Sequence, residues 1–290
     1  MSFDNTPMKY DRAEALTRIF EDTQDWYRSD PALKQNIEAS IAGTVLYPAA
    51  AVPQLTSPRF SQPISVSVSR RRTLEAALFH LQREPDANVT VLNFASATNP
   101  GGGVTRGSSA QEESLCRCST LYPTLCTPEL RREFYEFHRS LRDMRYTDAR
   151  IYTPGITVIK TDAGLPERMN PRDWRQVNVI TCAAPNLRER PYNAMNPGRG
   201  EAIRLSDAEL LSIHKTRGQK ILQTAAAHGT DILILGAFGC GAFRNPPSVV
   251  ARAYRELLDQ FDGYLRRVEF AVYCSARDSR NYEAFQAAMR

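Results

Sequence analysis

The sequence contains no apolar run that approaches the ~20 residues needed to cross a lipid bilayer. Its first ten residues also lack the apolar stretch and the small residues of a secretory signal. These two absences predict a chain that does not enter the membrane. A cytoplasmic location is therefore expected, and a nuclear one is left open.

Residues that bind metals are few, since the chain has six cysteines and four histidines. Cys116 and Cys118 lie close together, but no second cysteine pair or histidine pair lies nearby to complete four ligands. Without a secretory context, a disulfide framework is not expected either. We therefore predict reduced, mostly buried thiols, and neither a metal nor another cofactor.

Lysine is scarce as well, because all but five of the 37 basic residues are arginines. The planar guanidinium of arginine suits phosphate groups, although codon usage would give the same composition. The net charge is only +5, and the one tight basic run, residues 70–72, is expected at the solvated start of a helix. The charge pattern thus gives little support to a nucleic-acid-binding surface.

The first sixty residues differ from the rest of the 290-residue chain. Apolar residues recur with helical spacing over 11–28, and a second short helix fits 31–41. A segment rich in proline, serine and alanine follows at 48–63 and is typical of a connecting loop. We predict an N-terminal helical extension, residues 1–60, packed on a main body that comprises residues 61–290.

Short apolar runs alternate with amphipathic helices over the main body. Strands are predicted at 64–68, 89–95, 156–160, 177–182, 232–235 and 268–274. Helices are predicted at 72–83, 108–121, 128–142, 207–228, 247–261 and 281–289. This alternation predicts an α/β sandwich with a largely parallel or mixed central sheet, in which ligands bind beyond the carboxyl ends of the strands.

The first glycine-rich loop directly follows the predicted strand 89–95. It contains Asn99, Gly101, Gly102 and Gly103, and a predicted helix comes next. Consecutive glycines let the backbone approach a ligand closely, and a helix N-terminus favours an anion. A tight structural turn would explain this loop alone equally well.

The second glycine-rich loop, residues 236–247, also joins a strand to a helix that begins with proline. It follows neither the nucleotide-binding P-loop pattern nor the dinucleotide-binding fingerprint. Two such loops together predict a diphosphate-containing ligand. Phe238 and Phe243 add apolar surface for a ribose or a base, or belong to the core.

Adjacent acidic residues, Glu112 and Glu113, follow Gln111 in the predicted helix 108–121. Ser108 and Ser109 are expected to cap this helix. Acids here would complement the helix dipole, but beside a phosphate-binding loop they also suit glycosidic cleavage. That reaction needs a carboxyl group that protonates the leaving oxygen and a base that activates water.

Asn99-Pro100-Gly101-Gly102-Gly103, followed after seven residues by Gln111-Glu112-Glu113, resembles the signature of microbial-type poly(ADP-ribose) glycohydrolases. Residues 236–247 are similar to the second ligand loop of that family, and the resemblance covers roughly residues 60 to 290. It implies a macrodomain, a three-layer α/β/α fold with a mixed central sheet, preceded by the helical extension. It also implies ADP-ribose and ADP-ribosylated macromolecules as partners.

The resemblance implies roles for individual residues. Glu113 would be the catalytic acid and base, and Glu112 would hold the ribose hydroxyls. The remaining expected ligand-binding residues are Asn99, Gly101, Gly102, Gly103, Gln111, Phe238, Gly239, Cys240, Gly241, Ala242 and Phe243. The adenine site is poorly marked: Asn281 and Tyr282 in the last helix are candidates for it, or they are packing residues. Cleavage of the ribose–ribose bond would need no metal.

Other activities are compatible with these residues. The chain could remove a single ADP-ribose from a protein or a nucleic acid, or bind ADP-ribose without turnover; the retained acids disfavour the latter. Nucleic acid is expected as a partner only where it is itself ADP-ribosylated, and the chain is expected to be a monomer. The polar segment 188–204 is either a rim over the substrate or a plain surface loop.

Overall fold

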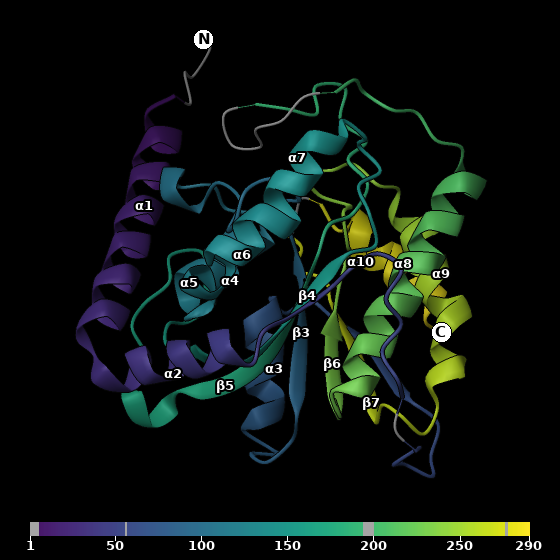
Figure 1. The fold of residues 1–290 in the computed structure, drawn as a ribbon, viewed down its shortest axis with the longest axis horizontal. Helices are drawn as coiled ribbons and strands as arrows, with labels where there is room; N and C mark the ends of the chain where they lie inside the picture. Colours follow the sequence, from purple (N-terminus) through teal and green to yellow (C-terminus); the bar gives the residue numbers. More distant parts are fainter. Residues whose placement is uncertain (1–5, 56, 194–199, 276–277) are drawn as a thin grey trace.

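A mixed β-sheet organises the chain in the computed structural model, which describes residues 6–55, 57–193, 200–275 and 278–290 (Figure 1). Over these residues the sheet has seven strands in the order β1-β4-β5-β3-β6-β7-β2. The strands are β1 (Val45–Tyr47), β2 (Ser65–Ser69), β3 (Val89–Phe94), β4 (Arg150–Val158), β5 (Arg175–Cys182), β6 (Ile232–Leu235) and β7 (Arg267–Ala271). β4 runs antiparallel to both of its neighbours, and the strands from β5 to β2 are parallel, so the predicted mixed sheet is confirmed.

Helices cover both faces of the sheet (Figure 1). One face carries α3 (Thr73–Leu81), α4 (Gln111–Cys118), α5 (Leu121–Leu125) and the segment formed by α6 (Pro128–Leu130), η2 (Arg131–Glu136) and α7 (Phe137–Leu141). The other carries α8 (Asp207–Ala227), α9 (Pro247–Leu258) and α10 (Arg280–Ala288). Strand β6 shows why this happens: Ile232 and Ile234 pack on the first layer, and Leu233 and Leu235 on the second. The expected three-layer α/β/α architecture is confirmed.

The N-terminal helices are α1 (Thr6–Ser29), which lies beside α4, and α2 (Pro31–Ala42), which packs on β4, where Asn36 Nδ2 donates to the carbonyl of Gly155 at 2.7 Å (Figure 1). Thr23, fully buried, donates a hydrogen bond of 2.6 Å from Oγ1 to the carbonyl of Arg117 in α4. Lys160 bonds to Ile19 and pairs with Asp22, although burial lowers the pKa of the lysine. These polar contacts fix α1 against α4 and against the segment that follows β4.

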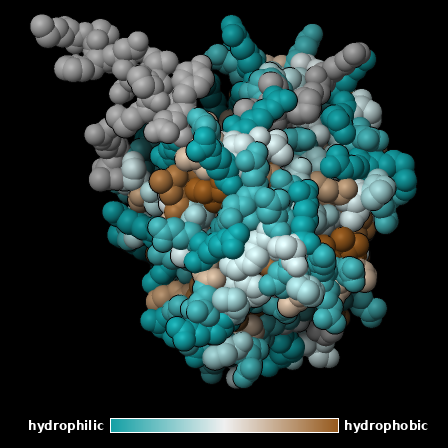
Figure 2. Space-filling model, turned by 90° about the vertical axis from the view of Figure 1, so that its left-hand side faces the viewer, coloured by the Kyte–Doolittle hydropathy of each residue, from teal (hydrophilic) through white to brown (hydrophobic). Residues whose placement is uncertain are grey.

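Hydrophilic side chains cover most of the face on which α1 lies, with smaller hydrophobic areas between them (Figure 2). Within the described residues, none of the helices is both long enough and apolar enough to span a membrane. The six cysteines form no disulfide, and three of them are buried.

Two strands differ from the sequence-based expectation. The predicted connection between the N-terminal helices and the main body is preceded by β1, which pairs with β4 at the edge of the sheet. β4 begins at Arg150, not at residue 156, because a bulge between Thr153 and Ile156 accommodates Pro154 and Gly155 within the strand. Those two residues are typical of a break, and the bulge explains why the strand continues through them.

The helix that carries the acids begins later than predicted. α4 starts at Gln111 with Ala110 before it and no side-chain cap, so the expected caps Ser108 and Ser109 are wrong. The preceding residues instead form a 3₁₀ turn, η1 (Val104–Arg106), which ends at Gly107 in the left-handed conformation (φ 71°). A Cβ atom at Gly107 would collide with the backbone of Ala13 in α1. The turn is therefore shaped by its contact with α1.

Substitution of Gly107 tests this contact. Gly107→Val should lower the free energy of unfolding by at least about 2 kcal/mol, because the side chain combines a strained φ with a clash against α1. Gly164→Ala is the matched control, since the nearest heavy atom to its Cβ is 3.9 Å away. Urea unfolding measures both, and equal stabilities of the two variants would contradict the packing described.

Two buried histidines should make the fold sensitive to acid. Burial lowers the pKa of His138 and of His214 to about 4. The unfolded chain binds these protons near pH 6.5, so stability falls as the pH drops from 6.5 toward 4. Between pH 7.5 and 5 the expected loss is about 2 kcal/mol for each histidine. Urea unfolding of His138→Gln should show a shallower pH dependence, and an unchanged slope would contradict the assignment.

Candidate active site

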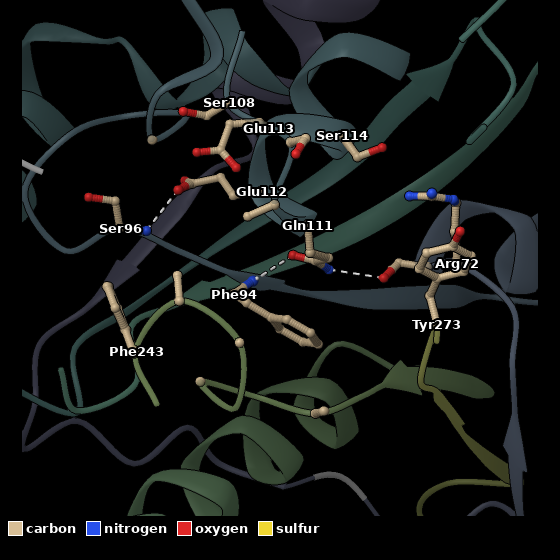
Figure 3. Close-up of a pocket in the computed structure, with 18 of the residues that line it drawn as sticks. Arg72, Phe94, Ser96, Ser108, Gln111, Glu112, Glu113, Ser114, Phe243 and Tyr273 are labelled. Carbon is tan, nitrogen blue, oxygen red and sulfur yellow. Dashed lines mark hydrogen bonds between the residues drawn. The ribbon is translucent and has the colours of Figure 1, made fainter. Parts of the chain in front are cut away.

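A cavity of about 750 Å³ opens at the carboxyl ends of the parallel strands (Figure 3). Its walls come from the loops that follow β3, β6 and β7, and from α1, α3 and α4. This is the edge at which ligands bind in open α/β sheets. The predicted glycine loops and acids therefore meet at one place.

Glu112 lies in the first turn of α4 and is 3% exposed. Its Oε2 accepts a hydrogen bond of 2.7 Å from the backbone N–H of Ser96 (Figure 3), and its Oε1 faces Asn93 Nδ2 at 3.4 Å. Burial raises the pKa of this carboxyl well above its usual value, and the neighbouring charge of Glu113 raises it further. The site thus favours a neutral Glu112 that is held by the loop after β3.

Glu113 is 7% exposed and lines the cavity beside Glu112. Its Oε1 accepts a hydrogen bond of 2.8 Å from the backbone N–H of Gly103. Its Oε2 is buried and has no hydrogen-bond partner among the described residues. One oxygen is therefore fixed by the protein, and the other is available to a ligand.

The glycines of the first loop make room for the two carboxyl groups and donate hydrogen bonds to them. Gly102 has a φ of 59°, and a Cβ atom there would collide with Oε1 of Glu113. The backbone N–H of Gly101 faces Glu112, and the Asn99 side chain bonds to the carbonyl of Gly102. Of Asn99 and the three glycines, all within the described residues, only Gly102 lines the cavity. Ligand contact by the other three stays a prediction.

Gln111 ties the acids to the sheet. Its Oε1 accepts a hydrogen bond of 2.9 Å from the N–H of Phe94, and its Nε2 donates to Leu92 and Thr73 (Figure 3). These bonds join the first residue of α4 to the end of β3 and to α3. Gln111 lines the cavity, but both atoms of its side-chain amide already bond to the protein. These bonds orient α4 relative to the sheet.

Three consecutive residues of the second loop leave their backbone amides without a protein partner. Gly239, Gly241, Ala242 and Phe243 line the cavity, and within the described residues the N–H groups of the last three make no hydrogen bond. Space is open around Gly241. Phe243 and this loop face the glutamates across the cavity (Figure 3). Free amides at such a turn suit a phosphate group.

Asn245 fixes the shape of the second loop and was not singled out in the sequence. Its buried Nδ2 donates to the carbonyls of Pro185, Gly239 and Phe243 at 2.8, 3.1 and 3.3 Å. Its Oδ1 lies 2.8 Å from Nε2 of His214 in α8. Since the histidine is neutral at physiological pH, it donates this bond from Nε2.

Two predicted ligand residues of the second loop point elsewhere. Phe238 is 1% exposed and packs on Phe94 and His214, so it occupies the core, which was one of its two alternatives. The Cys240 thiol lies 3.8 Å from the carbonyl of Phe238, and burial raises its pKa to about 12. The cavity lining includes neither residue.

The far end of the cavity brings together residues that are distant in sequence and that no local pattern linked. The guanidinium of Arg72 lies over the ring of Tyr273 at 3.8 Å, at the opposite end from Phe243 (Figure 3). Asn281 also lines this cavity, whereas Tyr282 packs against Arg70. Tyr273 lies near the carboxyl end of the predicted strand 268–274, and that position was a usable signal.

Three further parts of the chain reach the cavity. Asp162 lines it and accepts hydrogen bonds from Ser114 and from the N–H of Leu74, and burial raises its pKa. Arg188 and Asn193 reach it from the predicted rim, of which residues 194–199 lie outside the described part. Helix α1 contributes Arg12, Ala13 and Leu16. The described residues contain no cluster of three or more metal-binding side chains.

The fold and the site define a macrodomain-like protein with two buried acids beside a glycine-rich loop. Residues 19–161 match the microbial-type poly(ADP-ribose) glycohydrolase (PARG) catalytic domain. This range contains both glutamates and ends before the second loop. The chain belongs to the microbial-type poly(ADP-ribose) glycohydrolase family. No curated protein shows significant similarity to it.

Solved structures extend the similarity to the second loop. The poly(ADP-ribose) glycohydrolase of Thermomonospora curvata is 30% identical, with a TM-score of 0.79 over 95% of this chain and 99% of that one. Its structure with the inhibitor ADP-HPD gives 0.76 over 94% and 99%, also at 30% identity. The Deinococcus radiodurans enzyme in complex with ADP-ribose is 33% identical, with a TM-score of 0.70 over 87% and 96%.

Removal of the Asn245 amide tests its hold on the second loop, with ADP-ribose as the probe. Asn245→Ala should weaken ADP-ribose binding about 10-fold, because three loop carbonyls lose a common donor. Thr90→Val is the control, since it removes a buried hydrogen bond of 2.7 Å to Thr230, from a residue near the other end of β3. Calorimetry should show weaker binding in the first variant only; equal affinities would contradict the role of Asn245.

Proposed function

We propose that this protein hydrolyses the ribose–ribose O-glycosidic bonds of poly(ADP-ribose) and releases ADP-ribose. One observation carries the proposal: Glu113, whose Oε2 has no partner, and the free amides of residues 241–243 lie on opposite sides of one cavity. The activity and the bound ADP-ribose of the solved relatives agree with it.

Glu113 acts as the acid and then as the base in this proposal. Its Oε2 gives a proton to the leaving oxygen as the bond to the ribose C1 breaks. Water then adds to C1, and its proton returns to the same carboxylate. The unpartnered oxygen is the one available for this exchange, while Gly103 holds the other. Glu112, whose raised pKa favours a neutral carboxyl, holds ribose hydroxyls.

The remaining contacts divide along the cavity. The free amides of residues 241–243 hold the diphosphate, and Phe243 packs on the distal ribose. The Arg72–Tyr273 pair and Asn281 provide a flat surface and a polar group for adenosine at the far end. The choice of polymer over a single ADP-ribosyl group, the monomeric state and the cytoplasmic location stay predictions.

Glu113→Gln tests the catalytic role. The amide keeps an oxygen for the N–H of Gly103, so ADP-ribose affinity should be retained. Release of ADP-ribose from polymer should fall by ~10²-fold or more, because the group that transfers the proton is lost. Chromatography of products and calorimetry with ADP-ribose measure the two properties.

The matched control is Glu129→Gln, an exposed glutamate outside the cavity, which should leave both properties unchanged. Unchanged turnover in Glu113→Gln would overturn the assigned role. A wild-type protein that binds ADP-ribose and releases it from no conjugate would instead be a reader of ADP-ribose.

A further inference from the structure

The polar segment that follows β5 reaches the cavity and is fixed at its start. Asn186 is fully buried, and its Nδ2 donates a hydrogen bond of 3.1 Å to the carbonyl of Pro191. Its Oδ1 accepts a hydrogen bond of 3.3 Å from the backbone N–H of Arg188. These two bonds close a turn over residues 186–191. The backbone of Arg188 is therefore held in place at the base of the predicted rim.

The same segment bonds directly to the second loop. The backbone N–H of Leu187 donates a hydrogen bond of 3.0 Å to the carbonyl of Phe243, which is the last of the three residues with free amides. Arg188 is the next residue after this contact, and its side chain lines the same cavity as the loop. Arg188 thus begins beside the place proposed for the diphosphate.

The side chain of Arg188 is available to a ligand. It is partly exposed, and it forms no ion pair and donates no hydrogen bond within the part of the chain that the structure describes. The arginine of the second loop itself, Arg244, is exposed and does not line the cavity. The loop therefore presents amides but no full positive charge, whereas a diphosphate carries two negative charges.

Arg188 is distinguished by its position from the other arginines of the cavity. The described arginines in its lining are Arg12, Arg72, Arg106 and Arg188. Arg72 lies over Tyr273 at the opposite end from Phe243 (Figure 3), and the remaining two belong to α1 and η1. Of the four, Arg188 alone belongs to the segment that is bonded to the second loop.

We propose that the guanidinium group of Arg188 binds the diphosphate of the ADP-ribosyl group together with the free amides of residues 241–243. This inference rests on the proposed function and adds a cationic ligand to its phosphate site. Guanidinium groups form paired, charge-assisted hydrogen bonds with phosphate oxygens. The start of the predicted rim is then part of the ADP-ribose site and not a plain surface loop.

A pair of variants from this one segment tests the proposal, with ADP-ribose as the probe. Arg188→Gln removes the charge from the cavity. Arg190→Gln is the matched control, because it removes the same charge two residues further along, from an exposed side chain outside the cavity lining. Calorimetry at low and high salt measures the affinity for ADP-ribose, and release of ADP-ribose from polymer is measured separately.

Arg188→Gln should bind ADP-ribose roughly 10-fold more weakly than the wild type, because a charge-assisted contact is lost. Its affinity should also depend less on salt, which screens the interaction between charges. On polymer, kcat/KM should fall by a similar factor with kcat nearly unchanged, since this contact is made equally before and during bond cleavage. The control should match the wild type in all three properties.

Three outcomes overturn the inference. Equal affinities of Arg188→Gln and the wild type would exclude contact with the diphosphate, and a loss on polymer alone would place Arg188 on the leaving side of the bond. Weaker binding with an unchanged salt dependence would assign Arg188 to the shape of the loop. A wild type that binds ADP-ribose but releases none from polymer would refute the proposed function, whereas the binding comparison would still decide the role of Arg188.

Discussion

The contact on which the site depends is the pair of buried carboxyl groups held by backbone amides of the loop after β3. Ser96 and Gly103 donate to Glu112 and Glu113 at 2.7 and 2.8 Å, and Gly102 must lack a Cβ atom for the carboxyl groups to lie there. Two adjacent acids in a buried place are costly unless hydrogen bonds compensate for the lost water. Since these bonds come from the backbone, the loop and the first turn of α4 form one rigid unit.

The two glycine loops have opposite tasks despite similar sequences. In the first loop, backbone amides donate to the carboxyl groups of Glu112 and Glu113 in α4. In the second loop, the amides of residues 241–243 have no protein partner and are free for a ligand. Glycine permits close approach of the backbone but does not specify what approaches. The difference comes from partners distant in sequence: α4 approaches the first loop, and Asn245, linked to His214, holds the second open.

The sequence therefore predicted the parts of the site that are local. A strand, a glycine loop and an acidic helix start lie within 25 residues of one another, from Val89 to Glu113, and the structure brings them together at the cavity. The wall formed by Arg12, the stacking of Arg72 on Tyr273 and the position of Asp162 depend on packing between distant elements, which no local pattern records. For the same reason β1 was missed, because three residues form a strand only where β4 offers an edge.

Helix α4 also explains why the N-terminal helices belong to the catalytic unit. It has eight residues, no side-chain cap and three buried charged residues, so it would not be stable alone. Arg117, one turn after Glu113, is buried with Nε and Nη1 unpartnered among the described residues, and burial lowers its pKa. Each such group costs about 1–3 kcal/mol. The helix persists because Gln111 fixes its start and Thr23 of α1 bonds to its last turn. Loss of α1 would release α4, so the extension stabilises the geometry of the acids as well as forming a wall of the cavity.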